Sequence, residues 1–592
     1  MSVILAKYAL LLAAALFISA FFLLLPDLTR CSLAAEEEAK GRRVCVPPLV
    51  LTALYAVIAF ARLGNTTSPQ SFREFEGDGI LLELEEESEI DSMLLFTGIN
   101  TGSYVLEYSA DGENYFYLGE LEQKYDSLLK WESVPLQEPV RARYLRIFAA
   151  GKPWLGEAAV FRNGEKLAFA SQCQLTDEQN TVPDRQTYMN SSYFDEIYHV
   201  RTAVENLNGL YPYELSHPPL GKLLISAGMK LWGVTPFGWR FSGTLLGVMM
   251  LPLMYVFLRK LFGGELIPLC GMSLTAFDFM HFTQTRIATI DTYAVFFTLL
   301  MYLCMYLFVS GKAKRPRLCL GLSGVFFGLG AASKWTCLYA GAGLALIWLG
   351  YWVLRFLDES KREDKNMAGV FRELCGNVLF CLAFFVAIPA AIYYVSYIPY
   401  GAARGMSGVG MLFSREYARL VLDNQSFMLR YHVSVTASHP YASRWYQWIL
   451  DIRPILYYLQ SGENGTSSRI AAFVNPALCW GGLLAMVLMG CLAVIRRDRK
   501  AAFILIGYLA QLLPWLAVER VTFEYHYFNC TVFLALALSY AFSLVKNAYE
   551  RGWLYPIAYS GFSAALFALF YPVLSGTGGS SALLGWFSTW PL

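Results

Sequence analysis

Long apolar segments dominate the chain and decide what it can fold into. A run of roughly 18 apolar residues is long enough to cross a bilayer as a helix. Of the 592 residues, 56% are hydrophobic and only 16% are charged, whereas soluble proteins carry about 25% charged residues. The predicted spans are 4–25, 47–63, 236–258, 265–283, 289–310, 317–333, 336–356, 371–397, 473–495, 500–518, 523–545 and 554–574. We therefore expect a polytopic α-helical membrane protein with about 12 transmembrane helices.

The distribution of Lys and Arg predicts how these helices are oriented. Basic groups fall in alternate loops, at 30–43, 259–260, 312–317, 355–365, 496–500 and 546–551. Because cytoplasmic loops are enriched in Lys and Arg, we expect these loops in the cytoplasm and both termini outside. Segment 4–25 has an alternative interpretation as a signal peptide cleaved near Leu33, although Arg30 follows it as a stop-transfer charge would.

Two large segments, 64–235 and 398–472, then lie outside the cytoplasm, and part of the first has a different pattern. Apolar and polar residues alternate from Ser71 to Leu167, with turn sequences at Ala110-Asp111-Gly112 and Asn163-Gly164. Short alternating strands at regular spacing predict a β-sandwich. The pieces YVLEYSADGENY and ARYLRIFAAG resemble discoidin-like (F5/8 type C) jelly rolls. That resemblance implies either a carbohydrate-binding domain or a structural spacer.

Net charge and cysteine content add little evidence for other classes. The formal net charge is +1, so nothing indicates a nucleic-acid partner. Most of the 12 cysteines lie inside apolar runs, Cys270 and Cys304 among them. Such cysteines behave as small hydrophobic residues, and no disulfide framework is predicted.

Unusual polar residues gather in the outer segments and at the outer ends of the spans, and all 6 histidines belong to this set. Ionisable groups beside membrane spans are costly and usually line a cavity, whereas a transporter would place them near the midplane. A pocket at the outer membrane surface is therefore favoured. Asp278 lies within a predicted span and needs a partner, for which Arg286 or Lys334 is expected. The candidate pocket residues are His199, His217, Asp278, Asp291, His432, His439, Trp445 and His526.

Several short motifs together resemble the protein O-mannosyltransferase family of the GT-C superfamily. They are Phe194-Asp195-Glu196, His217-Pro218-Pro219-Leu220-Gly221-Lys222, Gly238-Trp239-Arg240, Gln284-Thr285-Arg286, Ser333-Lys334-Trp335, Tyr431-His432, Ser438-His439-Pro440 and Tyr525-His526-Tyr527. The resemblance covers 47–63 and 185–592 and implies a GT-C fold. The inserted sandwich and the short second outer segment depart from the eukaryotic pattern. The chain looks like bacterial phospholipid-carrier-dependent glycosyltransferases, and the sugar and the acceptor stay open.

The resemblance assigns the role of general base to the acid of the Asp-Glu motif, and the chemistry of the other side chains suggests their roles. Asp195 is the expected general base for the acceptor hydroxyl, and Glu196 orients Asp195, binds the sugar or exchanges roles with it. Arg240 and Arg286 are the first candidates for the donor phosphate, because Arg recognises phosphate oxygens in a planar, bidentate manner. Lys334 and Lys222 are the next candidates.

No cofactor is expected to be required. The leaving group is a lipid phosphate with protein cations nearby, which stabilise its growing charge, and we find no DxD motif of the kind that holds a metal-bound nucleotide sugar. A divalent ion held by His199 with Asp195 or Glu196 remains an open alternative.

The chain thus divides into six predicted segments. They are two N-terminal transmembrane helices (1–66), the extracytoplasmic sandwich (67–172), a catalytic outer loop (173–235), a transmembrane bundle (236–397), a second outer loop (398–472) and C-terminal transmembrane helices (473–592).

The resemblance implies an inverting glycosyltransferase of the plasma membrane with its active site on the extracytoplasmic side. It would move a sugar, mannose by resemblance, from a polyprenyl-phosphate donor to a hydroxyl of a protein or glycan. The alternatives are a GT-C transferase acting on a lipid or cell-wall glycan, a lipid-linked-sugar flippase, and a receptor that uses the sandwich alone. The sequence indicates no oligomeric state.

Overall fold

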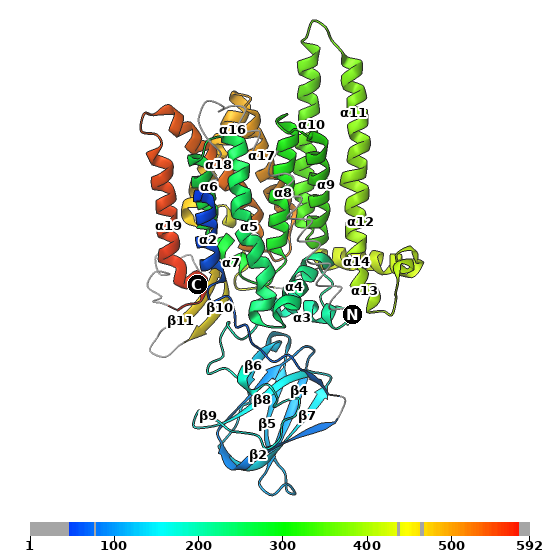
Figure 1. Cartoon of the computed structure of the whole chain (residues 1–592), viewed down its shortest axis with the longest axis vertical. Coiled ribbons are helices and arrows are strands. Elements are labelled where there is room, and N and C mark those ends of the chain that lie inside the picture. The colour runs from blue at the N-terminus through cyan, green and yellow to red at the C-terminus, as the bar shows by residue number, and fades with distance from the viewer. Residues whose placement is uncertain (1–45, 76–77, 435–437, 462–466, 579–592) are drawn as a thin grey trace. The chain divides into compact units, whose positions relative to one another are not determined.

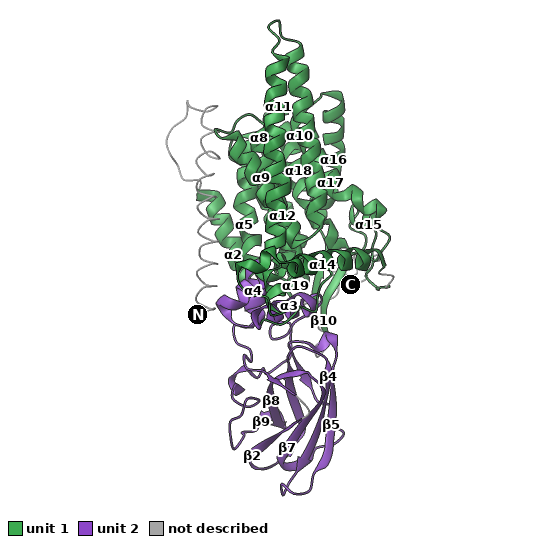
Figure 2. Cartoon of the chain, turned by 90° about the vertical axis from the view of Figure 1, so that its right-hand side faces the viewer, with its two compact units in different colours: residues 1–61, 209–224, 243–592 green, residues 62–208, 225–242 purple. Residues whose placement is uncertain are grey.

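The computed structural model describes residues 46–75, 78–434, 438–461 and 467–578 (Figure 1). The predicted span 4–25 lies outside these residues. The chain divides into two compact units, coloured separately in Figure 2. A helical unit contains residues up to 61, 209–224 and everything from 243 onward, and a second unit contains 62–208 and 225–242. The predicted catalytic loop 173–235 is therefore shared between the two units.

The second unit is built around antiparallel strands. They are β1 (Arg73–Glu74), β2 (Gly79–Ile90), β3 (Ser92–Thr97), β4 (Gly102–Ser109), β5 (Phe116–Gln123), β6 (Lys130–Ser133), β7 (Val140–Gly151), β8 (Trp154–Arg162) and β9 (Glu165–Lys166). One sheet has the order β2-β7-β4-β5, and the other has the order β1-β8-β3-β6 with β9 beside β8.

Both sheets contribute to one core, which contains Leu82, Tyr104 and Leu145 from the first and Leu95 and Leu155 from the second. The alternation of apolar and polar residues therefore correctly predicts a two-layered β structure. The likeness to discoidin-like jelly rolls stays a prediction.

One predicted turn shows why the strands end where they do. Asn163 and Gly164 join β8 to β9 with φ values of 55° and 80°. Positive φ at both central residues is the requirement of the tight hairpin turn whose twist matches that of its strands, and Asn-Gly meets it at the lowest steric cost.

The helical unit holds the membrane helices. Nine helical segments in the described residues are long and apolar enough to span a bilayer. They are α5 (Pro236–Phe262), α8 (Asp291–Val309), α9 (Pro316–Ser333), α10 (Thr336–Ser360), the run from α11 to α13 (Met367–Ala402), α16 (Pro476–Ile495), α17 with η7 (Arg499–Ala517), η8 with α18 (Glu524–Ala548) and α19 (Leu554–Ser575). Each corresponds to a predicted span, and the count of about 12 stays a prediction.

The other two predicted spans within the described residues form shorter apolar helices. Span 47–63 becomes α2 (Val46–Phe60), and span 265–283 breaks into α6 (Leu266–Ala276) and α7 (Phe279–Thr285). The break occurs at Asp278, whose backbone is extended (φ −74°, ψ 129°) and whose carboxylate caps α7 by accepting a hydrogen bond from the His281 amide. Asp is a preferred residue at such a position because it satisfies an amide that the first helical turn leaves open.

This capping corrects the partner predicted for Asp278. Its second oxygen accepts a hydrogen bond from the backbone amide of Asn475 at 3.0 Å. The carboxylate is thus satisfied by two main-chain donors rather than by Arg286 or Lys334, and it stabilises the junction between α7 and α16.

The two ends of the helical bundle differ in chemistry. The connection between α10 and α11 (Met367–Cys381), which carries the predicted cytoplasmic charges at 355–365, lies at one end. The helices α13 (Ile398–Ala402) and α14 (Arg415–Ser434) lie at the opposite end (Figure 1). The second outer segment therefore occupies the end opposite the basic loop, as its predicted orientation requires.

Candidate active site

The Asp-Glu motif begins helix α3 (Glu196–Leu207) in the second unit. Asp195 is the N-cap residue and is half-buried, whereas Glu196 is completely buried. The preceding Phe194 has a φ of 50°, in the left-handed region that residues with a large side chain rarely adopt. Such backbone strain costs about 1–3 kcal/mol and is concentrated at functional sites. The position of Asp195 is thus set by a strained turn on one side and a helix start on the other.

Glu196 forms a buried ion pair with Arg240. The Arg240 Nε and one terminal nitrogen donate to the two Glu196 oxygens, both at 2.8 Å, and the Trp239 indole donates to the same carboxylate at 3.3 Å. Both charged side chains have no exposed surface. Of the three roles that the sequence left open for Glu196, this geometry suits the orienting role, because the pair fixes the start of α3.

The same geometry corrects the role predicted for Arg240. Besides Glu196, its guanidinium donates to the carbonyl oxygens of Leu63, Tyr188 and Ser191 at 2.8–2.9 Å. All five N–H groups of an arginine are then in use. Arg240 therefore has no donor left for a phosphate and acts as a structural anchor.

Within the helical unit, residues 209–218 form a loop that is held by Lys222 of α4 (Pro219–Trp232). The Lys222 ammonium donates to the Glu214 carboxylate at 2.6 Å and to the carbonyl oxygens of Glu214 and His217 at 2.8 and 2.9 Å. These are the three hydrogen bonds that an ammonium group can make, and the side chain has no exposed surface. Lys222 is thus a loop anchor, which corrects its predicted role as a phosphate ligand.

His217 at the end of this loop lies beside His432 of α14, with ring centroids 5.4 Å apart. The His217 Nδ1 lies 3.2 Å from a Glu214 oxygen, and the His432 Nε2 lies 2.9 Å from the Ser216 carbonyl oxygen. The sequence predicted both histidines for the donor and acceptor pocket, and the structure brings them together.

Two cations, Lys334 and Arg520, lie near this histidine pair. Lys334, directly after α9, donates to Asp291 at the start of α8 at 2.6 Å. The next residue, Trp335, has its ring centroid 6.1 Å from that of His432. Burial, His217, Arg520 and Lys334 together lower the pKa of His432 to about 4. Burial also lowers the pKa of His217, with Lys334 and Lys222 adding to the effect and Glu214 opposing it. We call His217, His432, Lys334 and Arg520 the outer cationic cluster.

The other predicted site residues have different surroundings from those of His217 and His432. Arg286 donates to the carbonyl oxygens of Ala59 and Ala61 at 3.0 and 2.8 Å, which ties α7 to the end of α2. His526 is buried in an aromatic group with Trp448 and Trp515, at centroid distances of 5.8 and 4.5 Å.

His439 and Trp445 lie in the second outer segment. His439 is exposed and its ring lies 5.0 Å from that of Phe523. Trp445 is half-buried at the start of the short helix α15 (Trp445–Trp448). His199 is buried on α3 in the second unit.

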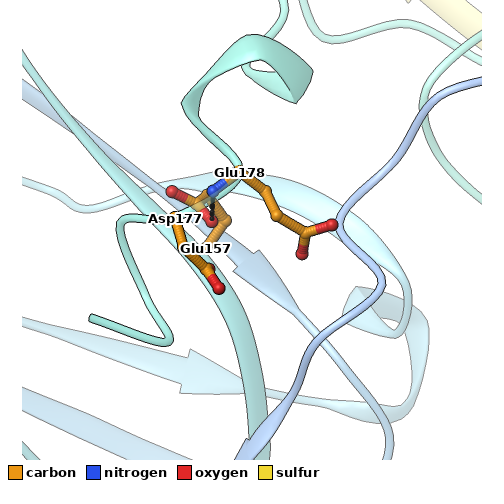
Figure 3. Close-up of side chains that lie close together, drawn as sticks. All are labelled: Glu157, Asp177 and Glu178. Carbon is orange, nitrogen blue, oxygen red and sulfur yellow. Dashed lines mark hydrogen bonds between the residues drawn. The ribbon is translucent and has the colours of Figure 1, made fainter. Parts of the chain in front are cut away.

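Three acidic residues of the second unit have oxygens close enough together to bind a metal ion. Within the described residues, Glu157, Asp177 and Glu178 of the second unit form the one such group of Asp, Glu, His or Cys (Figure 3). Their oxygens already accept hydrogen bonds, for example Glu178 from the amides of Gln70 and Ser71 at 2.8 and 3.0 Å. The prediction that no metal is required stays a prediction.

Glu214 and Arg520 are two further functional candidates in the structure. Glu214 stands three residues before His217 and eight before Lys222, a spacing that would have suggested a carboxylate for both. Arg520 is half-buried, and no hydrogen bond or ion pair of its side chain occurs within the described part of the chain. The Arg520 guanidinium is therefore available to donate to a phosphate, whereas that of Arg240 is not.

Comparison with known proteins agrees with these features. Residues 233–399 match the family model described as dolichyl-phosphate-mannose-protein mannosyltransferase, and residues 419–590 match the model of the C-terminal four-transmembrane region of protein O-mannosyltransferase. Together the two matches cover more than half of the chain. The chain belongs to the protein O-mannosyltransferase family.

Relatives and solved structures support this membership. A Mycolicibacterium smegmatis polyprenol-phosphate-mannose–protein mannosyltransferase is 28% identical over 415 residues, which cover 61% of this chain and 78% of the relative. The enzyme of the same name from Corynebacterium glutamicum is 26% identical over 471 residues, 70% of this chain and 87% of the relative. The fold resembles that of the Saccharomyces cerevisiae protein O-mannosyltransferase Pmt1-Pmt2 complex bound to its sugar donor, with a TM-score of 0.58 at 14% identity over 68% of this chain and 89% of that one.

This protein O-mannosyltransferase family member is therefore a multi-span membrane glycosyltransferase with a GT-C fold. The two family matches begin after the strands of the second unit. The sandwich thus stands outside the part of the chain that defines the family.

Proposed function

We propose that the chain transfers mannose from a polyprenyl-phosphate carrier to a hydroxyl group of a protein, with its active site on the extracytoplasmic side of the membrane. The bacterial relatives carry this activity in their names. The observation that carries the proposal is the outer cationic cluster, which lies at the end of the bundle opposite the basic loop between α10 and α11. A lipid-linked phosphate lies at the membrane surface, because its apolar tail is in the bilayer while its charged group is in contact with water.

Asp195 is the proposed base. It removes the proton of the acceptor hydroxyl while the new bond forms from that oxygen to the anomeric carbon and the bond from the anomeric carbon to the phosphate oxygen breaks. A single displacement of this kind inverts the anomeric configuration. The strained Phe194 and the buried Glu196–Arg240 pair support this assignment, because a base must be held in one position to act.

The outer cationic cluster is the proposed phosphate site. The leaving phosphate gains one negative charge as the sugar departs. Fixed cations in a partly buried site stabilise this charge without having to reorganise at the moment of reaction. Arg520 and Lys334 supply those charges, and no metal is needed in this scheme.

Transfer of labelled sugar tests the proposal. Purified protein receives radiolabelled polyprenyl-phosphate mannose together with a Ser/Thr-rich peptide, and labelled peptide is counted. Asp195→Asn should lower the rate by about 10²- to 10⁴-fold, the range that general-base catalysis contributes. Asp184→Asn is a matched control, because Asp184 is an exposed acid in the same segment.

The outcomes separate the alternatives. Equal rates for Asp195→Asn and wild type would remove Asp195 as the base. Labelling of a lipid or glycan acceptor instead of peptide would change the acceptor class. Movement of the donor across the bilayer without any transfer would favour a flippase.

A further inference from the structure

We propose that His217 and His432 share one proton, which the enzyme takes up when the leaving phosphate acquires its second negative charge. This inference deepens the proposed function and rests on it. It assigns to two imidazoles a task distinct from that of the fixed cations: they match a charge that is present in the product but absent from the donor.

The hydrogen bonds fix which nitrogen of each ring is basic. A carbonyl oxygen only accepts, so the His432 Nε2, 2.9 Å from the Ser216 oxygen, must carry a hydrogen. The neutral His432 ring then has its lone pair on Nδ1. That atom is buried and has no hydrogen-bond partner within the described residues. Buried polar nitrogens are normally satisfied, so this atom is suited to a ligand.

His217 is oriented in a similar way. Its Nδ1 lies 3.2 Å from Glu214 Oε1 and 3.0 Å from the Ser216 hydroxyl. The Ser216 hydroxyl donates its hydrogen to Glu214 Oε1, and Lys222 donates to Glu214 Oε2, so both neighbours accept from Nδ1. The hydrogen is consequently on Nδ1, and Nε2 is the basic nitrogen of the neutral ring. Two rings with centroids 5.4 Å apart repel each other when both are charged, so the pair holds at most one proton near neutral pH.

The charges around the pair keep it neutral in the empty site. His217 faces Glu214, Lys222 and Lys334, while His432 faces His217, Arg520 and Lys334. Together with burial, the cations lower the pKa of both rings, that of His432 to about 4. A bound phosphate reverses this balance because it neutralises the cations and stabilises an imidazolium directly.

The reaction itself supplies the difference in charge. The donor is a phosphodiester with one negative charge, and the product is a phosphate monoester that carries two above its second pKa of about 6. The proton of the acceptor hydroxyl goes to Asp195, and the leaving oxygen keeps the electron pair of the broken bond. The proton on the His pair comes from solvent, and it offsets the second charge of the bound product.

The test compares two ligands that differ by this one charge. Farnesyl phosphate is a monoester and its methyl ester is a diester. Binding of each to the detergent-solubilised full chain is measured by titration calorimetry at pH 7.5 in two buffers of different ionisation enthalpy, which gives the number of protons taken up. We expect the monoester to take up about one proton more than the diester.

Variants assign the uptake to the pair. His432→Gln keeps an amide donor for the Ser216 carbonyl but cannot titrate, and His217→Gln similarly keeps a donor for Glu214. Each should reduce the extra uptake, and wild type should bind the monoester up to about tenfold more tightly per pH unit between pH 8.5 and 7. The comparison of the two ligands on wild type does not depend on either variant folding.

Equal uptake for monoester and diester, or an extra uptake that persists in His432→Gln and His217→Gln, would overturn the inference. If mannose transfer is intact in that case, the proposed function stands and only the proton assignment fails. If neither ligand binds and no sugar is transferred, the proposed function fails together with the inference.

Discussion

At the residue scale, the side chains that look alike in sequence divide into anchors and available groups. Arg240 and Lys222 use every donor on protein acceptors. A buried ion pair with satisfied hydrogen bonds fixes a structure, but breaking it leaves an uncompensated charge. Arg520 and His432 are the opposite case, because each presents polar atoms that no described residue satisfies.

The anchor role of Arg240 predicts the effect of its replacement. Arg240→Lys keeps the charge but loses most of the five hydrogen bonds, so we expect the free energy of unfolding to fall by about 3 kcal/mol. Thermal unfolding of the purified protein, followed by the loss of the monodisperse peak on heating, measures this. Arg496→Lys, an exposed arginine directly after α16, is the control. A variant with unchanged stability but a raised KM for the donor would instead make Arg240 a phosphate ligand.

At the element scale, small residues on α9 decide how closely two membrane segments approach. The run from α11 to α13 contains a π-helical turn, η4 (Leu382–Ala387), and continues as α12 (Ile388–Val395). A Cβ added at Gly324 would lie 2.1 Å from the Phe384 carbonyl oxygen, and one at Gly328 would lie 2.8 Å from the Pro389 Cα. Glycines permit such close approach of helices in membranes.

This packing predicts that Gly324→Ala separates the two segments. The methyl group has no room beside the Phe384 backbone, so we expect a loss of about 1–3 kcal/mol in stability, the usual cost of overpacking. Gly350→Ala in α10 is the matched control, because an added Cβ there meets nothing within 4 Å. Heat inactivation and the exchange of amide hydrogens in residues 382–387 measure both variants. Equal behaviour of the two would show that the packing tolerates a methyl group.

At the scale of the whole molecule, the orientation of the bundle determines which solvent the outer cationic cluster faces. The basic loop at 355–365 is expected in the cytoplasm, which places the segment between α13 and α14 outside.

Cysteine labelling of intact cells tests this orientation. In a background with Cys173, Cys375 and Cys491 replaced by Ser, Val409→Cys should react with an impermeant maleimide added from outside, since Val409 is 75% exposed. Glu363→Cys should react only after the cells are permeabilised. The reverse pattern would place the outer cationic cluster in the cytoplasm and contradict the proposed function.

The sequence by itself determined the membrane class, the nine described spans and the strand pattern of the second unit, because these depend on periodicity and on the length of apolar runs. It also placed His217, His432 and Lys334 in one group, since the two histidines belong to the outer segments and Lys334 lies at the outer end of a predicted span. Only the tertiary structure decided which polar side chains are available. Whether the N–H groups of Arg240 or Arg520 are already hydrogen-bonded depends on carbonyl and carboxylate groups from distant parts of the chain. A local sequence pattern does not contain that information.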